Sequence, residues 1–165
     1  MSIKIDRCLV EGNIGKERHK GLKKVGVSEE KIKGHLNKAL HNFKAMMLFK
    51  KEGFSDWSAS AAFYCLYHAL LAILAKKGYE SRNQNCTFIM IEEMINNKEL
   101  DITIAELKEI FDKDVTSDIE HSNKLLDIRE NMQYSIKTSL EGEEFLSLKE
   151  RTKNLFDKIR REVER

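Results

Sequence analysis

Apolar side chains recur at helical spacing along almost the whole chain after residue 27. The clearest stretch, residues 57–75, carries no charged side chain and contains neither Gly nor Pro. Two apolar stripes run along it, so a helix here must be buried on more than one side. The pattern therefore predicts a central helix with the other helices packed around it. The two stripes consist of Trp57, Ala61, Tyr64, His68 and Leu71, and of Phe63, Leu66, Leu70 and Ile73.

Five further segments each carry one apolar stripe, with charged residues on the opposite side. The first covers residues 28–51, where Ser28 followed by two acidic residues favours a helix start. Its stripe consists of Ile32, Leu36, Leu40, Phe43 and Met47. The other segments are residues 86–96, residues 102–112, a helix capped by Ser117 or Asp118 whose stripe includes Ile136 and Leu140, and the residues after Gly142.

These elements predict an all-α fold, a bundle of about four to six helices over residues 28–165. The chain has no proline, and its 165 residues suffice for one domain with a real core. Residues 1–27 differ, because they hold four of the eight glycines and show little periodicity. We therefore expect an irregular, flexible N-terminal arm there.

The arm is basic, with seven Lys and Arg residues against three acidic ones, whereas the whole chain has a formal net charge of only +2. Bulk charge therefore does not predict a general polyanion binder. Two interpretations of the arm stay open. It makes an electrostatic contact to nucleic acid or to a partner protein, or it is a solvated tail without a ligand.

The three cysteines, Cys8, Cys65 and Cys86, form no CxxC pair. This odd count, with an N-terminus that lacks a long apolar segment, favours reduced thiols in the cytoplasm. Cys65 lies among apolar residues and is interpreted as a small core side chain. The central segment is short for a membrane span and contains His68 and several hydroxyls, so we expect no membrane insertion.

The motifs of several common enzyme classes are missing from the sequence. There is no Gly-rich phosphate loop, no HExxH and no GxSxG. His35 and His41 are not four residues apart, so they do not form a helical metal pair and are interpreted as surface histidines. We expect neither a metal ion nor another cofactor.

Arg129 lies beside the apolar stripe of the fifth segment, in its most polar stretch, LLDIRENMQYS. An arginine at the margin of a core needs an acceptor for its N–H groups, and Glu130, Asp127 or a ligand phosphate could serve. Two interpretations follow. Arg129 is a structural node that holds this helix to the central one, or it is part of a ligand site.

The polar side chains of the central helix also allow two interpretations. His68 is a core histidine with a satisfied ring or a catalytic residue. Tyr64 and Tyr67 are interpreted as core residues whose hydroxyls bind neighbouring groups.

Four short patterns occur in order along the chain: CLxxGxI, FYxLYHALLAILxxKGY, RxxxC and RExxxY. Their order and spacing resemble small prokaryotic proteins of the HEPN domain family. The resemblance implies an up-and-down helical bundle that commonly forms a homodimer. It also implies genomic pairing with a minimal nucleotidyltransferase, often as a toxin–antitoxin system. The residues that carry it include Cys8, Gly12, Tyr64, Tyr67, His68, Gly78, Tyr79, Arg82, Cys86, Arg129, Glu130 and Tyr134.

Active HEPN proteins are metal-independent ribonucleases, and their motif is an Arg followed by a His after about four to six residues. The arginine holds the phosphate and the histidine moves a proton from the ribose 2′-hydroxyl. This sequence departs from that motif. The last histidine, His121, precedes Arg129, and the expected His positions hold Tyr134, Ser135 and Ile136.

Two further family positions hold amides here. Gln84 stands where related proteins often carry a His after the central helix, and Gln133 stands where an acidic residue often precedes the final Tyr. Each change removes a titratable group and keeps a hydrogen-bonding side chain.

Three functional hypotheses follow from the resemblance. The first is a non-catalytic HEPN-like module that binds a nucleotidyltransferase partner, nucleotide or RNA in a polar cleft. The second is a metal-independent ribonuclease toxin in which His68 or Tyr134 moves the proton beside Arg129. The third is a structural homodimer without a ligand. The candidate ligand-binding residues are Arg129, Asn131, Gln133, Tyr134, Tyr64 and Gln84.

Overall fold

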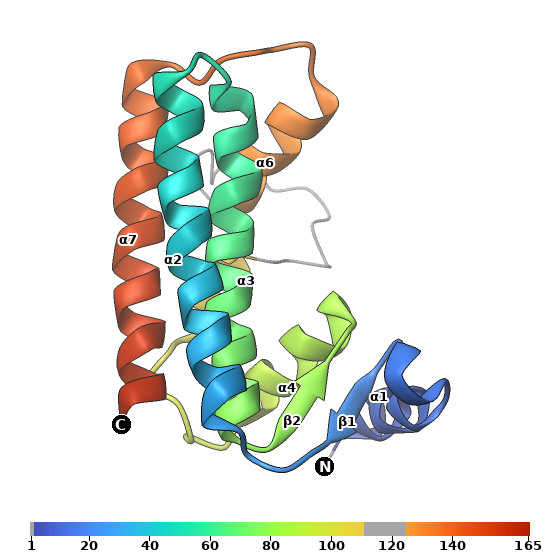
Figure 1. Cartoon of the computed structure of the whole chain (residues 1–165). Coiled ribbons are helices and arrows are strands. Elements are labelled where there is room, and N and C mark those ends of the chain that lie inside the picture. Colours follow the sequence, from blue (N-terminus) through green and yellow to red (C-terminus); the bar gives the residue numbers. More distant parts are fainter. Residues whose placement is uncertain (1, 111–124) are drawn as a thin grey trace.

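The structure, a computed structural model, describes residues 2–110 and 125–165. Its described part is mostly helical with one small two-stranded sheet, which confirms the predicted all-α class (Figure 1). The helices are α1 Ile3–Asn13, α2 Glu29–Lys51, α3 Ser58–Lys76, α4 Gln84–Asn96, α5 Ile104–Ile110, α6 Leu125–Tyr134 and α7 Gly142–Glu164, with short 3-10 turns at Lys16–Arg18 and Ser55–Trp57. The strands are β1 Leu22–Lys24 and β2 Tyr79–Ser81.

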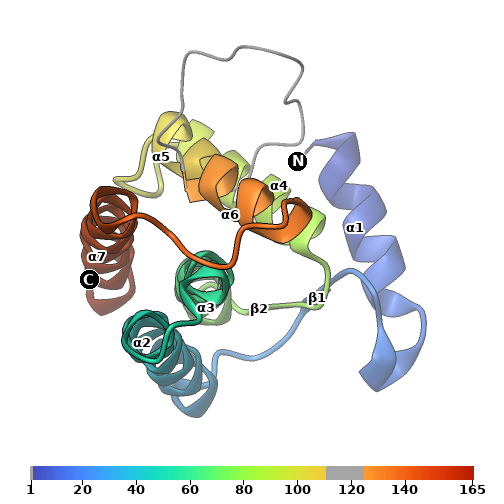
Figure 2. The same ribbon diagram turned by 90° about the horizontal axis from the view of Figure 1, so that it is seen from above.

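The core is built around α3, as the uncharged segment predicts. Seen along the bundle, α3 lies between α2 and α7 on one side and α4 and α6 on the other (Figure 2). Its Leu66 and Leu70 are fully buried. The helix is long and apolar enough to cross a membrane, but 83% of its most apolar window is buried inside the protein, so it serves here as a core helix.

Part of one predicted stripe of α3 faces outward, whereas its Ala61 and Leu71 are buried. The side chains of Trp57 and Tyr64 are 59% and 43% exposed, and His68 is half-buried. These three positions recur at helical spacing and therefore share one side of the helix. Tyr64 is thus not the core residue that the sequence predicts, whereas Tyr67 is buried.

Helix α2 begins where the sequence predicts, because the Ser28 side chain accepts a hydrogen bond from the Lys31 backbone N–H. The buried residues of α2 are Ile32, Ala39 and Met46, which recur every seven residues. Leu40, which the predicted stripe includes, is 43% exposed. Leu36, Phe43 and Met47 are partly buried and pack against the core, so the predicted stripe is correct except at Leu40.

The segment predicted as an irregular arm, residues 1–27, is largely regular. Helix α1 packs on β1, and β1 pairs antiparallel with β2, with Leu22 opposite Ser81. A Cβ atom at Gly12 would overlap the Leu22 carbonyl oxygen, so only glycine allows this approach. Glycine here permits close packing rather than flexibility.

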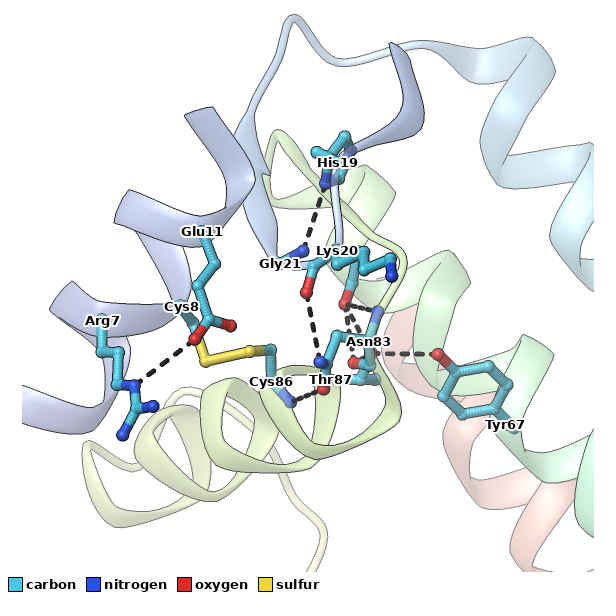
Figure 3. Close-up of a disulfide and its surroundings, with 11 residues drawn as sticks. Arg7, Cys8, Glu11, His19, Lys20, Gly21, Tyr67, Asn83, Cys86 and Thr87 are labelled. Carbon is cyan, nitrogen blue, oxygen red and sulfur yellow. Dashed lines mark hydrogen bonds and ion pairs between the residues drawn. A yellow bond between two sulfur atoms is a disulfide. The ribbon is translucent and has the colours of Figure 1, made fainter. Parts of the chain in front are cut away.

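A disulfide joins the first segment to the bundle. Cys8 of α1 and Cys86 of α4 are bonded, with Cα atoms 5.7 Å apart (Figure 3). The expectation of three reduced thiols is therefore wrong for this pair, whose partners lie 78 residues apart and show no spacing motif. Cys65 is free and buried, as predicted, and burial raises the pKa of its thiol to about 12.

The predicted fifth helix differs at its end. Helix α6 stops at Tyr134, Ile136 is fully exposed, and Leu140 is buried in the linker to α7. The predicted caps Ser117 and Asp118 lie outside the described residues. The Leu140 backbone is held by Ser55 and Lys50, so it anchors the linker to the end of α2 and the start of α3.

Candidate functional site

Arg129 of α6 lies over an aromatic ring of the central helix. Its guanidinium carbon is 3.8 Å from the centroid of the Phe63 ring of α3, a cation–π contact. Its Nε atom is buried and has no hydrogen-bond partner among the described residues. Glu130, one of the predicted acceptors, is exposed, and the side chain of Asp127 lies outside the described part. Phe63, which the sequence does not single out, is therefore the principal contact that positions Arg129.

A set of aromatic rings on α3 fixes Phe63. The Phe63 ring stacks on Tyr67 with centroids 5.8 Å apart and meets the edge of Tyr64 at 5.2 Å. Tyr67 also contacts Phe88 of α4. Because Phe63 and Tyr67 are buried, the surface under the guanidinium is rigid. The exposed Tyr64 lies beside this surface and brings its hydroxyl to the solvent side.

The buried hydroxyl of Tyr67 leads to a polar cluster at the start of α4. The Tyr67 and Thr87 hydroxyls are 3.3 Å apart, and Thr87 also donates to Ser81 at 2.8 Å. Asn83 caps α4 by accepting from the Cys86 backbone N–H and also donates to the Lys20 carbonyl (Figure 3). Burial raises the pKa of Tyr67, so this hydroxyl is a neutral structural group.

The other candidate residues occupy different positions around α6 and α4. Gln133 follows Arg129 by one helical turn and shares its side of α6. Asn131 and Tyr134 point in other directions, and Tyr134 is 81% exposed. Gln84 is half-buried as the first residue of α4. Thus Gln133 lies on the Arg129 side of α6 and Tyr64 contacts the edge of Phe63, whereas Asn131 and Tyr134 lie at other positions around α6.

His68 has a partner that the sequence does not predict. Its Nδ1 atom lies 3.2 Å from Nδ1 of His35 in α2, and the two ring centroids are 5.4 Å apart. His35 is half-buried, so the expectation of a plain surface histidine is wrong. Burial is the largest cause that lowers both pKa values, that of His68 to about 4. Both rings are therefore neutral at pH 7.

His68 and Arg129 contact different sides of the central helix. Phe63, on which Arg129 lies, precedes His68 by five residues, which corresponds to a rotation of about 140° around α3. Tyr67 stands between them, since its ring contacts both Phe63 and His68. The geometry of one chain thus gives no support for proton transfer by His68 at a phosphate held by Arg129.

A second buried histidine organises the basic N-terminal segment. The Gly21 backbone N–H points at Nδ1 of His19, and Nε2 of His19 lies 3.1 Å from Glu80. Nδ1 therefore accepts and Nε2 donates. Glu80 also binds Lys31 at 2.6 Å and pairs with Arg82, and the bond from Lys31 is the main cause that lowers the pKa of Glu80 to about 2.

A cavity of about 520 Å³ opens between α1, α4 and α5. The Cys8–Cys86 disulfide forms part of its wall, Lys4, Arg7 and Lys108 bring positive charge, and Phe88 and Leu107 bring apolar surface. None of the candidate residues from the sequence lines it. Arg7 is already paired with Glu11, which also borders the cavity.

Fold and site together define a class, an all-α bundle module in which one arginine is stacked on the core helix. The HEPN domain family model matches residues 32–162, from the first turn of α2 to the last of α7, and the chain belongs to this family. No curated protein matches the chain. Helix α1, strand β1 and Cys8 lie outside the matched range.

Proposed function

We propose that this protein is a non-catalytic HEPN module that binds the phosphate of a nucleotide or of RNA through Arg129, and that it works with a nucleotidyltransferase partner in a toxin–antitoxin-type pair. The observation that carries the proposal is the guanidinium stacked on Phe63 with a buried Nε that has no acceptor among the described residues. The membership of the HEPN family supports the choice of ligand class.

A stacked guanidinium suits phosphate binding for a physical reason. The ring covers one face of the planar group and leaves its N–H edge for an anion, which it can hold with two parallel hydrogen bonds. The terminal N–H groups of the guanidinium can donate to phosphate oxygens, and these charge-assisted bonds are the strong ones. Gln133, one turn further on, adds an amide donor on the same side of α6.

The proposal does not include ribonuclease chemistry, because residues 2–110 and 125–165, which the structure describes, bring no histidine against Arg129, and His121 lies outside them. No histidine follows Arg129 in the sequence, and His68 contacts His35 on another side of α3. Tyr134 is exposed at the end of α6. It follows Arg129 by five residues and therefore lies on a different side of that helix. The proposal therefore assigns Arg129 to binding and assigns it no acid–base partner for cleavage.

The proposal also includes a homodimer. The exposed side of α3 carries two large aromatic side chains, Trp57 and Tyr64, and no charge. Aromatic side chains on an uncharged surface are typical of the centre of protein interfaces. This side lies next to the Phe63 ring, since Tyr64 contacts it, so a second copy there would bring two Arg129 sites near one another.

The test measures binding of a fluorescently labelled RNA oligonucleotide and of ATP to the purified chain by anisotropy. We expect Arg129→Ala to weaken binding by about tenfold or more, because a charge-assisted contact is lost. Arg129→Lys should retain only part of the wild-type affinity, since lysine lacks the planar, forked guanidinium group. Arg160→Ala is the matched control, because Arg160 is an exposed arginine of α7 paired with Glu164.

Equal affinities of the wild type and Arg129→Ala would contradict the proposal, as would an equal loss with Arg160→Ala. The same samples are checked for RNA cleavage. Cleavage by the wild type that disappears with Arg129→Ala would instead establish the ribonuclease hypothesis, and absence of any RNA or nucleotide binding would favour the structural homodimer.

A further inference from the structure

We propose that His35 and His68 form a two-imidazole binding site for a divalent transition-metal ion of the Zn²⁺ type, on the side of the bundle where α2 meets α3. The pair lies apart from the contact of Arg129 with Phe63, and the inference does not rest on the proposed phosphate site.

The distance between the two nitrogens matches a chelate. A metal ion bound at about 2.0–2.1 Å from each nitrogen, with the Nδ1 atoms 3.2 Å apart, would subtend an N–metal–N angle of about 100°. This angle lies between the octahedral and tetrahedral values. The two ring planes are inclined by 30° to one another.

The protonation states also suit a metal ion. Metal ligation requires neutral imidazoles, and burial keeps both rings neutral at pH 7 by lowering their pKa values. The charged groups that act on the pair are Lys31, Lys38 and Glu80. Lys31 is bound to Glu80 at 2.6 Å, which offsets its charge, and Lys38 is exposed and screened by water.

The pair supplies two ligands, and the described residues contain no group of three or more His, Cys, Asp or Glu side chains that could hold a metal. With the described residues alone, water or an exogenous anion would complete the coordination. Imidazole ligands select Zn²⁺, Ni²⁺ or Cu²⁺ over Mg²⁺ and Ca²⁺, which prefer oxygen. Both rings are half-buried, so an ion from solvent can reach them.

The test is a calorimetric titration of the whole chain with ZnCl₂ after treatment with a chelator, without reductant so that the Cys8–Cys86 bond stays closed. We expect one Zn²⁺ per chain. His35→Gln and His68→Gln should each lower the affinity by about tenfold or more, because one of two ligands is lost. Glutamine keeps a hydrogen-bonding group at each position, and circular dichroism with thermal melting checks that both variants fold.

His41→Gln is the matched control, since His41 is an exposed histidine of the same helix. Its affinity for Zn²⁺ should equal that of the wild type. The inference fails if the wild type binds no Zn²⁺, if MgCl₂ binds as tightly, or if the two pair variants bind Zn²⁺ as tightly as the His41 variant. In each of these cases the contact between the rings is a hydrogen bond and nothing more.

Discussion

Individual side chains in this protein gain their roles from partners on other helices. Arg129 was identifiable from the sequence as a cation at the margin of an apolar stripe, but its contact with Phe63 was not. The contact between His35 and His68 was likewise not predictable, because the two residues belong to α2 and α3 and form no sequence motif. Periodicity assigns a side chain to one side of its own helix, and only the packing of helices decides what it meets.

At the scale of residues, the imidazole pair predicts how stability depends on pH. The folded His68 has a pKa of about 4, whereas an unfolded histidine has its ordinary value near 6.5. Between these values the unfolded chain binds more protons, so the stability of the folded chain falls as the pH falls through this window.

We expect His68→Gln to remove part of this dependence. Thermal melting of the wild type and the variant at pH 7 and pH 5 measures it, and the variant should lose less in melting temperature than the wild type. His41→Gln serves as the control and should follow the wild type. An identical drop in all three proteins would show that the imidazole pair does not contribute.

At the scale of elements, the largest difference between expectation and structure concerns residues 1–27. Weak periodicity and four glycines predict an arm, yet α1 and β1 are packed on the bundle. Gly12 is buried against the Leu22 backbone, a contact that depends on residues from two elements. In contrast, the starts of α2 and α7 were predictable, since Ser28 and the Glu141–Glu144 capping box act within one turn.

The disulfide between Cys8 and Cys86 is expected to stabilise the folded chain. Closing a loop of 78 residues removes conformational entropy from the unfolded chain, a contribution of about 2–4 kcal/mol. We therefore expect the double variant Cys8→Ser/Cys86→Ser to unfold in urea with a free energy lower by about that amount.

Reductant provides the control for this prediction. Dithiothreitol should lower the unfolding free energy of the wild type toward that of the double variant and leave the double variant unchanged. The free thiol of Cys65 is present in both proteins and cannot account for the difference. A wild type that is equally stable with and without reductant would refute the role of the bond.

At the scale of the whole molecule, the arrangement was the most predictable feature. An uncharged segment among amphipathic ones has only one favourable place, the centre of the bundle, and α3 lies there. The match of the HEPN family model over residues 32–162 agrees with this arrangement. The sequence pattern could not predict which side of α3 is exposed to solvent, because this depends on how α2 and α6 pack against it.

The central position of α3 predicts the effect of core truncation. Leu70 is fully buried, and we expect Leu70→Ala to lower the free energy of unfolding by about 2–5 kcal/mol, measured in urea. Leu146→Ala is the matched control, since Leu146 is 62% exposed, and should change it by less than about 0.5 kcal/mol. Similar losses for both variants would mean that the bundle is not organised around α3.

The bond between Cys8 and Cys86 also decides how the molecule would respond to a mechanical load. Because helices α2 and α3 lie wholly between the two cysteines, a pull on the two ends passes through the sulfur atoms and bypasses both helices. The bridge withholds 78 residues, roughly 260–280 Å of extended chain, from stretching. The central helix α3 therefore lies within a covalently closed loop and bears no tension until the disulfide bond is broken.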